Sequence, residues 1–213
     1  MIEKELENYI DRHTQKECDV LSQLTRATHQ RILRPRMLSG NAQGQLLKML
    51  CKMLGARRVL ELGTFTGYSA ISMAQGMPKD GILHTIDNND EIADFTQEYI
   101  EKAGLSDKII CHIGEACDII KHLDEQWDMI FIDADKREYP QYYNLLIDKL
   151  RSGGIIAADD VLWDGKVVDP CVISNPDAQT QGILDFNTMV QNDERVENVL
   201  LPLRHGLMLV RKK

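Results

Sequence analysis

In the stretch VLELGTFTGYSA, residues 59–70, the sequence pattern changes from one typical of a strand to one typical of a helix. Val59–Leu62 is a short apolar run typical of a strand, Gly63 follows it directly, and residues 67–77 have a helical pattern. A strand, a glycine turn and a helix in this order are typical of a parallel sheet with crossover helices. Glycine at the turn lets the chain reverse tightly and lets a ligand approach the backbone.

The same alternation continues downstream of this stretch. Strands are expected at 82–86, 109–113, 129–132 and 155–158, with helices at 90–103, 115–123 and 139–150 between them. This pattern predicts an α/β fold: a Rossmann-like, doubly wound, mostly parallel sheet with helices on both faces. A helix near 180–192 precedes two runs, 196–201 and 207–210, that are close enough to form a hairpin. We therefore expect a seven-stranded sheet with an antiparallel C-terminal strand.

The segment before the first strand is helical in pattern. Residues 3 to about 30 are polar with helical spacing, and residues 35–54 carry apolar side chains at helical spacing. Pro35 predicts that a helix ends or turns before it. The length of 213 residues suits one domain, so we expect a helical extension over 1–55 and an α/β core over 56–213.

Composition narrows the classes of partner. The formal net charge of −8 argues against a large nucleic-acid footprint, which is normally basic. The five cysteines are widely spaced without a CxxC pair, which is typical of reduced thiols in the cytosol. The N-terminal MIEKELENYIDRH is charged, and no apolar run reaches the roughly 18 residues of a membrane helix. We therefore expect a cytoplasmic protein without membrane attachment.

An acid follows the second expected strand. Asp87 lies 24 residues after Gly63, where dinucleotide folds carry an acid that binds the ribose hydroxyls. Glu61, beside the turn, would repel phosphates, and neither GxGxxG nor GxxxxGK[ST] is present. Together these acids favour a nucleoside without phosphates, such as S-adenosylmethionine with its positive sulfonium. The simpler alternative is that Gly63 only turns the chain and that Asp87 caps a helix.

Two further strands end in acids. Asp133 follows the run 129–132, and Asp159 and Asp160 follow the run 155–158. One crossover helix separates these strands, so they can be neighbours whose acids converge. Clustered carboxylates repel and raise one another's pKa unless a cation is present, and oxygen donors favour magnesium, calcium or manganese. The pattern predicts a divalent metal site beside Asp135 and Lys136, although turn and cap roles are the alternative.

Lys136 has two possible roles. On a surface it would be a solvated charge. Beside a metal and a cationic cofactor, positive charge could lower its pKa enough for it to act as a general base.

Five motifs carry a resemblance to a known family. MLSGNAQGQLL, VLELGTFTGYSA, TIDNN, FIDADKREY and DDVLWDG together resemble the metal-dependent class I O-methyltransferases, which include caffeoyl-CoA and catechol O-methyltransferases and bacterial relatives. The resemblance extends from about residue 35 to the end. It implies methyl transfer from S-adenosylmethionine to a hydroxyl of a catechol-like or hydroxycinnamate-like aromatic, with a divalent metal (Mg, Mn or Ca), by a protein that is frequently a homodimer.

The resemblance also implies roles for individual residues. The implied cofactor contacts are Ser39, Glu61, Gly63, Thr64, Ser69, Asp87, Ala116 and Asp135. The implied metal ligands are Asp133, Asp159 and Asp160, the implied base is Lys136, and the implied acceptor pocket includes Met37 and Trp163. Simple core packing is the alternative for Met37 and Trp163. The family commonly has Asn at the place of Asp160, so the added charge could alter metal affinity or preference.

Two other functions remain open from the sequence. Some bacterial relatives methylate a hydroxylated uridine in transfer RNA, and the basic candidates for RNA contacts are Arg31, Arg34, Arg36, Arg57 and Arg58. The acidic net charge argues against this function. The second alternative is a protein that binds a nucleoside without catalysis. The group Asp133, Lys136 and Asp159 argues against that, because binding alone needs no metal beside a lysine.

Overall fold

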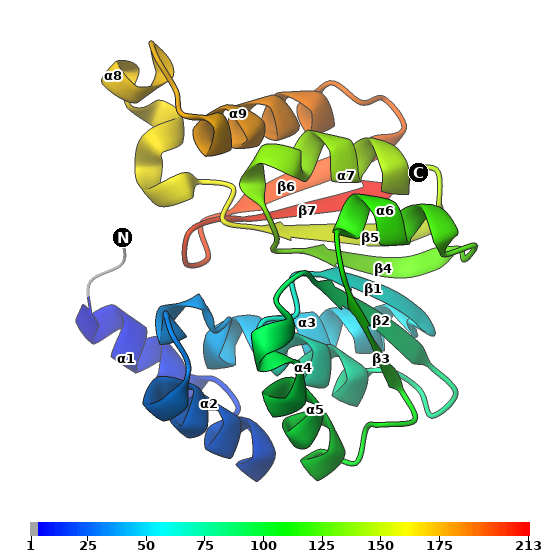
Figure 1. Cartoon of the computed structure of the whole chain (residues 1–213). Coiled ribbons are helices and arrows are strands. Elements are labelled where there is room, and N and C mark those ends of the chain that lie inside the picture. Colours follow the sequence, from blue (N-terminus) through cyan, green and yellow to red (C-terminus); the bar gives the residue numbers. More distant parts are fainter. Residues whose placement is uncertain (1–3) are drawn as a thin grey trace. The chain divides into compact units, whose positions relative to one another are not determined.

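The computed structural model describes residues 4–213 (Figure 1). The chain divides into two compact units, an N-terminal unit that ends at Glu115 and a C-terminal unit that begins at Ala116. No helix among the described residues is long and apolar enough to cross a membrane. The prediction of a single domain over 1–213 stays a prediction, and its first three residues lie outside the described part.

The N-terminal unit begins with helices. They are α1 (Lys4–His13), α2 (Asp19–Arg31), the short 3₁₀ helix η1 (Pro35–Met37) and α3 (Gly40–Leu54). The predicted helical pattern is confirmed, and α2 ends before Pro35 as expected. Within the predicted stretch, the described residues form two helices, because Cys18 is extended and begins α2 as its N-cap.

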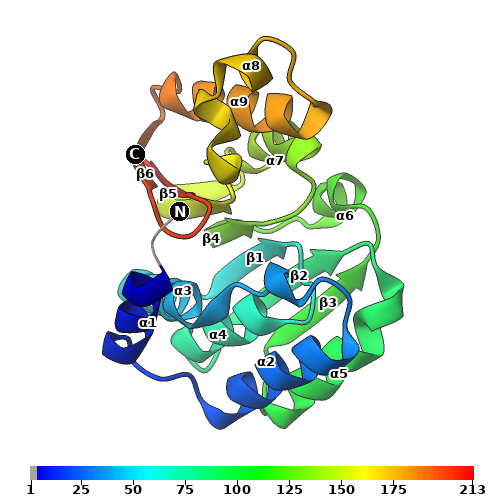
Figure 2. The same cartoon turned by 90° about the vertical axis from the view of Figure 1, so that its left-hand side faces the viewer.

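Three parallel strands follow in the order β3-β2-β1. The elements are β1 (Arg58–Leu62), α4 (Tyr68–Gly76), β2 (Ile82–Asp87), η2 (Asp90–Ile92), α5 (Ala93–Lys102) and β3 (Ile109–Ile113). Helices α4 and α5 lie together on one side of these strands in both views (Figures 1 and 2). The core contains the apolar residues of β1 and most of α4, which is nearly all buried.

The turn after β1 requires glycine. Gly63 has φ +96° and Gly67 has φ +86°, in the left-handed region that side chains disfavour. The amide of Gly63 still donates to Ile86 O at 2.8 Å, so the chain turns immediately after the last ladder bond. The predicted strand, glycine turn and helix are confirmed.

The C-terminal unit contains four strands in the order β4-β5-β7-β6. Its elements are α6 (Ala116–His122), β4 (Trp127–Ile132), η3 (Lys136–Glu138), α7 (Tyr139–Leu146), β5 (Leu150–Asp159), η4 (Trp163–Val168), α8 (Pro170–Ile173), α9 (Ala178–Gln191), β6 (Val196–Leu201) and β7 (Leu207–Lys212). Strands β4 and β5 are parallel, and β7 is antiparallel to both β5 and β6. Helices α7 and α9 lie side by side (Figures 1 and 2).

The described residues thus contain seven strands in the predicted α/β class, with the predicted C-terminal hairpin. The main difference is at β5, which begins at Leu150 although the sequence indicated residue 155. The segment Arg151–Gly154 is polar and glycine-rich, so its sequence pattern does not predict a strand. A register irregularity between Trp127 and Met129 accommodates these residues beside β4. The predicted loop over 163–178 contains the two short helices η4 and α8.

Candidate active site

The ends of β4 and β5 carry the acidic residues that the sequence indicated. The strands are neighbours, with Ile132 paired to Ala158, so Asp133 and Asp159 follow at the same edge. The Lys136 ammonium donates to Asp133 Oδ1 at 2.8 Å and lies 3.3 Å from Asp160 Oδ2. Its side chain is only 8% exposed. Lys136 is therefore a buried cation between two carboxylates, and the surface alternative is wrong.

Tyr139, which the sequence reasoning did not single out, completes this group. Its hydroxyl accepts a hydrogen bond from Lys136 Nζ at 2.8 Å. Its single hydrogen can be donated either to Asp159 O, at 3.0 Å, or to Ile132 O, at 3.2 Å. The phenol therefore connects the ends of both strands to the lysine. The available signal was a polar aromatic residue three positions after Lys136.

The charges of this group shift one another's pKa values. Burial raises the pKa of Asp133 to about 7, although Lys136 lowers it, and the carboxylates of Asp159 and Asp160 add to the rise. For Lys136, burial alone would lower the pKa, but Asp133, Tyr139 and Asp160 raise it well above the usual range. The predicted lowering for a general base required a metal and a cationic cofactor. In the chain by itself, the carboxylates keep Lys136 charged.

The side-chain oxygens at these strand ends can be compared with the ligands that metal ions prefer. Asp133, Asp159 and Asp160 supply oxygen only, which suits magnesium, calcium or manganese. Among residues 4–213, no group of three His, Cys, Asp or Glu side chains is arranged to hold a metal ion. The Lys136 ammonium lies between Asp133 and Asp160 instead. The ligand chemistry fits a hard cation, whereas the observed side-chain arrangement is built around the lysine.

The backbone after β5 is unusual. Asp160, Trp163 and Asp164 have φ of +62°, +45° and +54°, and Gly165 has +82°. Aspartate and asparagine tolerate this left-handed conformation better than most residues, so the two are sterically equivalent at position 160. The Leu162 amide donates to His205 O at 2.8 Å, which fastens this segment to the hairpin between β6 and β7.

Trp163 is held in one orientation. Its indole Nε1 donates to Thr180 Oγ1 at 3.1 Å, and Lys166 Nζ lies 5.2 Å from the centre of its ring. Thr180 is fully buried at the start of α9 and is a further residue that the sequence reasoning missed. Met37 belongs to the N-terminal unit and is 51% exposed, which argues against core packing for that residue.

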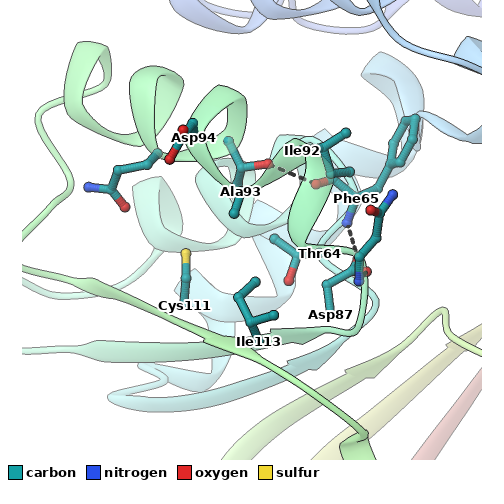
Figure 3. Close-up of a pocket in the computed structure, with 11 residues that line it drawn as sticks. Thr64, Phe65, Asp87, Ile92, Ala93, Asp94, Cys111 and Ile113 are labelled. Atoms are coloured by element: carbon teal, nitrogen blue, oxygen red, sulfur yellow. Dashed lines mark hydrogen bonds between the residues drawn. The ribbon is translucent and has the colours of Figure 1, made fainter.

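In the N-terminal unit, Asp87 terminates β2 as predicted. Its carboxylate accepts from the Phe65 amide at 2.7 Å and from the Asn89 amide at 3.0 Å. Asp87 and Thr64 line a cavity of about 160 Å³ together with Cys111 and residues of α5 (Figure 3). The two backbone bonds fix the carboxylate and leave it further lone pairs for a ligand.

The other predicted cofactor residues are in different environments. Glu61 is fully buried in β1, Ser69 is buried in α4, and Ser39 is buried at the N-cap of α3. Ala116 and Asp135 belong to the C-terminal unit. Asp135 caps η3 and is paired with Arg137, whose hydrogen bonds hold the pKa of Asp135 below its usual range.

Basic residues that RNA binding would need are partly engaged elsewhere. Arg57 is paired with Asp80. Arg31 lies 4.0 Å from Glu98 and its guanidinium lies over the ring of Phe95. These contacts with acids reduce the positive charge available to a phosphate backbone.

Comparison with known proteins shows similarity along most of the chain. The model of the O-methyltransferase family matches residues 11–213. The chain is 36% identical over 189 residues to caffeoyl-CoA O-methyltransferase 1 of Eucalyptus globulus, covering 83% of this chain and 75% of that protein. It is likewise 36% identical over 190 residues to caffeoyl-CoA O-methyltransferase 2 of Petunia hybrida, covering 83% of this chain and 76% of that protein.

Two solved structures are also similar. The O-methyltransferase from Bacillus cereus in complex with SAH has a TM-score of 0.90 at 28% identity, covering 98% of this chain and 97% of that chain. The O-methyltransferase TomG from Streptomyces achromogenes, involved in tomaymycin synthesis and solved with SAM, has a TM-score of 0.89 at 31% identity, covering all of both chains.

Proposed function

Since the chain belongs to the O-methyltransferase family, an enzyme family that uses S-adenosylmethionine, we propose that it methylates a hydroxyl of a small catechol-like or hydroxycinnamate-like aromatic with a divalent metal ion. The observation that carries this proposal is the buried Lys136 between Asp133 and Asp160 at neighbouring strand ends. A buried lysine among oxygen donors can hold or accept a proton at an acceptor hydroxyl.

The cofactor is assigned to the residues around the turn after β1. Asp87 would accept hydrogen bonds from the ribose hydroxyls, and its fixed carboxylate supports this role. Glu61 and Thr64 would serve the positive or hydrogen-donating parts of the molecule. Ser39, Gly63, Ser69, Ala116 and Asp135 are the remaining proposed contacts.

The metal is assigned to Asp133, Asp159 and Asp160, whose oxygen chemistry supports it. When bound, a divalent ion would acidify a hydroxyl that it coordinates. The positive charge of Lys136 now neutralises Asp133 and Asp160. A divalent ion held by these carboxylates would take over that role and lower the pKa of Lys136, so that its Nζ, after losing a proton, could receive the hydroxyl proton. Burial excludes water from this proton transfer, and the bond to Tyr139 keeps Nζ in place.

The acceptor ring is assigned to Trp163 and Met37. The bond from Trp163 Nε1 to Thr180 supports a fixed indole face against which an aromatic ring could pack. Assembly as a homodimer and a cytoplasmic location belong to the same proposal. Sedimentation analysis and cell fractionation would test them.

A hydroxyuridine in transfer RNA is the second candidate acceptor. The ion pairs of Arg31 and Arg57 and the net charge of −8 weigh against it. A protein that only binds a nucleoside is disfavoured by the buried Lys136, because such a function has no use for a lysine between carboxylates.

The decisive experiment is a methyl-transfer screen with labelled S-adenosylmethionine. Catechols, hydroxycinnamates and hypomodified transfer RNA are each tested with magnesium and with EDTA. We expect turnover of an aromatic diol that requires the metal and is slowed in Lys136→Ala. Turnover of RNA alone would support the second candidate. S-adenosylmethionine binding with no turnover of any acceptor would contradict the proposed reaction.

A further inference from the structure

A buried chain of three side chains connects β1 to the cavity beside Asp87. Glu61 on β1 and Thr85 on β2 are register partners, and both are fully buried. Thr85 Oγ1 donates to Glu61 Oε2 at 2.5 Å. Thr64 Oγ1, from the turn after β1, lies 2.6 Å from Thr85 Oγ1. Thr85, a polar residue inside the run Ile82–Asp87, thus has one polar partner on β1 and one in the turn after it.

The direction of each hydrogen bond follows from counting hydrogens. A hydroxyl has one hydrogen and two lone pairs, and an ionised carboxylate can only accept. The Thr85 hydrogen is directed to Glu61, so the Thr85 oxygen must accept the hydrogen of Thr64. Thr64 consequently has no hydrogen left for a ligand. Its oxygen can only accept hydrogen bonds at the cavity wall.

Other groups on this wall have the same polarity. The Asp87 carboxylate is an acceptor, and Thr96 directs its hydrogen to Phe65 O at 2.9 Å. Figure 3 shows Thr64, Asp87 and Cys111 around the cavity. Burial, with the negative charge of Glu61, raises the pKa of the Cys111 thiol to about 11. The oxygens of Thr64 and Asp87 therefore suit a ligand group with N–H or O–H donors, and the Asp87 carboxylate repels phosphate.

We propose that Thr85 is a positioning residue for cofactor binding, because it fixes the Glu61 carboxylate and makes Thr64 an obligate acceptor. The inference rests on the proposed function, since it assigns Glu61 and Thr64 to S-adenosylmethionine. The three residues act as one unit that selects hydrogen-donating groups of the cofactor. Of the three, only Thr64 lines the cavity, and Thr85 acts through its hydrogen-bonded partners.

Thr85→Val removes the hydroxyl at nearly constant volume, and Thr85→Ser retains it. Calorimetry with S-adenosylhomocysteine on the full chain should show affinity roughly tenfold weaker for the valine variant, the loss typical of a hydrogen bond left unsatisfied. The serine variant should stay close to the parent. Thr188→Val is the matched control, because the Thr188 hydroxyl bonds only to Leu184 O in the exposed part of α9.

A double-mutant cycle separates this role from general support of the fold. If Thr85 acts through Glu61, then Thr85→Val should cost much less affinity in a Glu61→Gln background than in the parent. Independent losses that simply add would overturn the proposal, as would parental affinity in Thr85→Val. If Thr85→Val does not fold, Thr64→Val provides the test, because it removes the acceptor but leaves the bond between Thr85 and Glu61. Parental affinity in that variant would also overturn the proposal. Absence of binding by the parent chain would overturn the proposed function itself, a different result.

Discussion

The ammonium of Lys136 donates a hydrogen bond of 2.8 Å to the hydroxyl of Tyr139, and both side chains are buried. The same hydroxyl reaches the carbonyl groups at the ends of β4 and β5. Lys136 is therefore anchored by a neutral group as well as by Asp133 and Asp160. Its position does not depend on the carboxylates alone, so Tyr139 would still hold Lys136 when the carboxylates bind a metal ion.

Replacement of Tyr139 by phenylalanine should loosen this anchor. The Lys136 ammonium would lose one buried acceptor, so the free energy of unfolding should fall by about 1–3 kcal/mol. Urea unfolding checks the loss, and methyl-transfer kinetics should show a lower kcat with little change in the affinity for S-adenosylmethionine. The control is Tyr142→Phe, which removes a hydroxyl bonded to Glu138 rather than to Lys136. Equal kcat in both variants would show that Tyr139 does not position the lysine.

Replacement of Lys136 by alanine should separate chemistry from binding. If Lys136 receives the proton, the single-turnover rate should fall by roughly 10²–10⁴-fold. Cofactor affinity, measured by calorimetry, should stay near that of the parent. Lys149→Ala is a control, because Lys149 also donates hydrogen bonds inside the same unit, to Ile120 O and Leu123 O. A parental rate for Lys136→Ala would remove its assignment as the base.

Replacement of Asp87 by alanine should weaken cofactor binding. A hydrogen bond to a charged group contributes roughly 1.5–3 kcal/mol, so the affinity for S-adenosylmethionine should fall about tenfold or more. The control is Asp80→Ala, which removes an exposed acid of the same unit that pairs with Arg57. Calorimetry that finds the parental affinity in the Asp87 variant would refute its role at the ribose.

Asp160 can be used to test metal binding separately from proton transfer. If its carboxylate is a ligand, Asp160→Asn should weaken magnesium or manganese binding in calorimetric titrations, while the saturated rate stays largely intact because an amide oxygen still coordinates. Asp133→Ala should abolish both binding and turnover, and EDTA should stop the parent reversibly. Full turnover of the parent in EDTA would contradict the metal assignment.

We expect the protein to lose stability in acid because of a partly buried histidine on β3. His84 Nδ1 and His112 Nε2 are 2.9 Å apart, and burial lowers the pKa of His112 below its usual value. As the pH falls below about 6.5, the unfolded chain takes up a proton at this residue before the folded chain does. The free energy of unfolding should therefore decrease from pH 6.5 downward until the lower folded pKa is passed.

The contribution of His112 can be isolated by substitution. His112→Gln should flatten this part of the profile of stability against pH, measured by urea unfolding at a series of pH values. His122→Gln, at the exposed end of α6, should leave the profile as it is. An unchanged slope in His112→Gln would mean that other groups cause the acid sensitivity.

The strand ends were predictable because their signal is local. The apolar run before Asp133 and the one before Asp159 define buried strands, and parallel topology brings their ends to one edge. Gly63 was predictable for the same reason, since its positive φ is a local requirement. The start of β5 was not predictable, because Arg151–Gly154 lacks apolar residues and its strand depends on pairing with β4.

Side-chain partners were also beyond the sequence. Thr85, Tyr139 and Thr180 are ordinary residues in their own segments, and their importance comes from contacts with Glu61, Lys136 and Trp163. The direction of the Lys136 pKa shift depends on distances to acids that no spacing rule supplies. The sequence could therefore indicate the candidate functional residues, but not the neighbouring side chains that position them through hydrogen bonds.

The left-handed backbone at Asp160 limits how this enzyme can be changed. A library that randomises this position should recover mainly Asp, Asn and Gly, because β-branched side chains are strained at φ +62°. Directed evolution can thus alter the charge beside Lys136 by one unit without moving the loop.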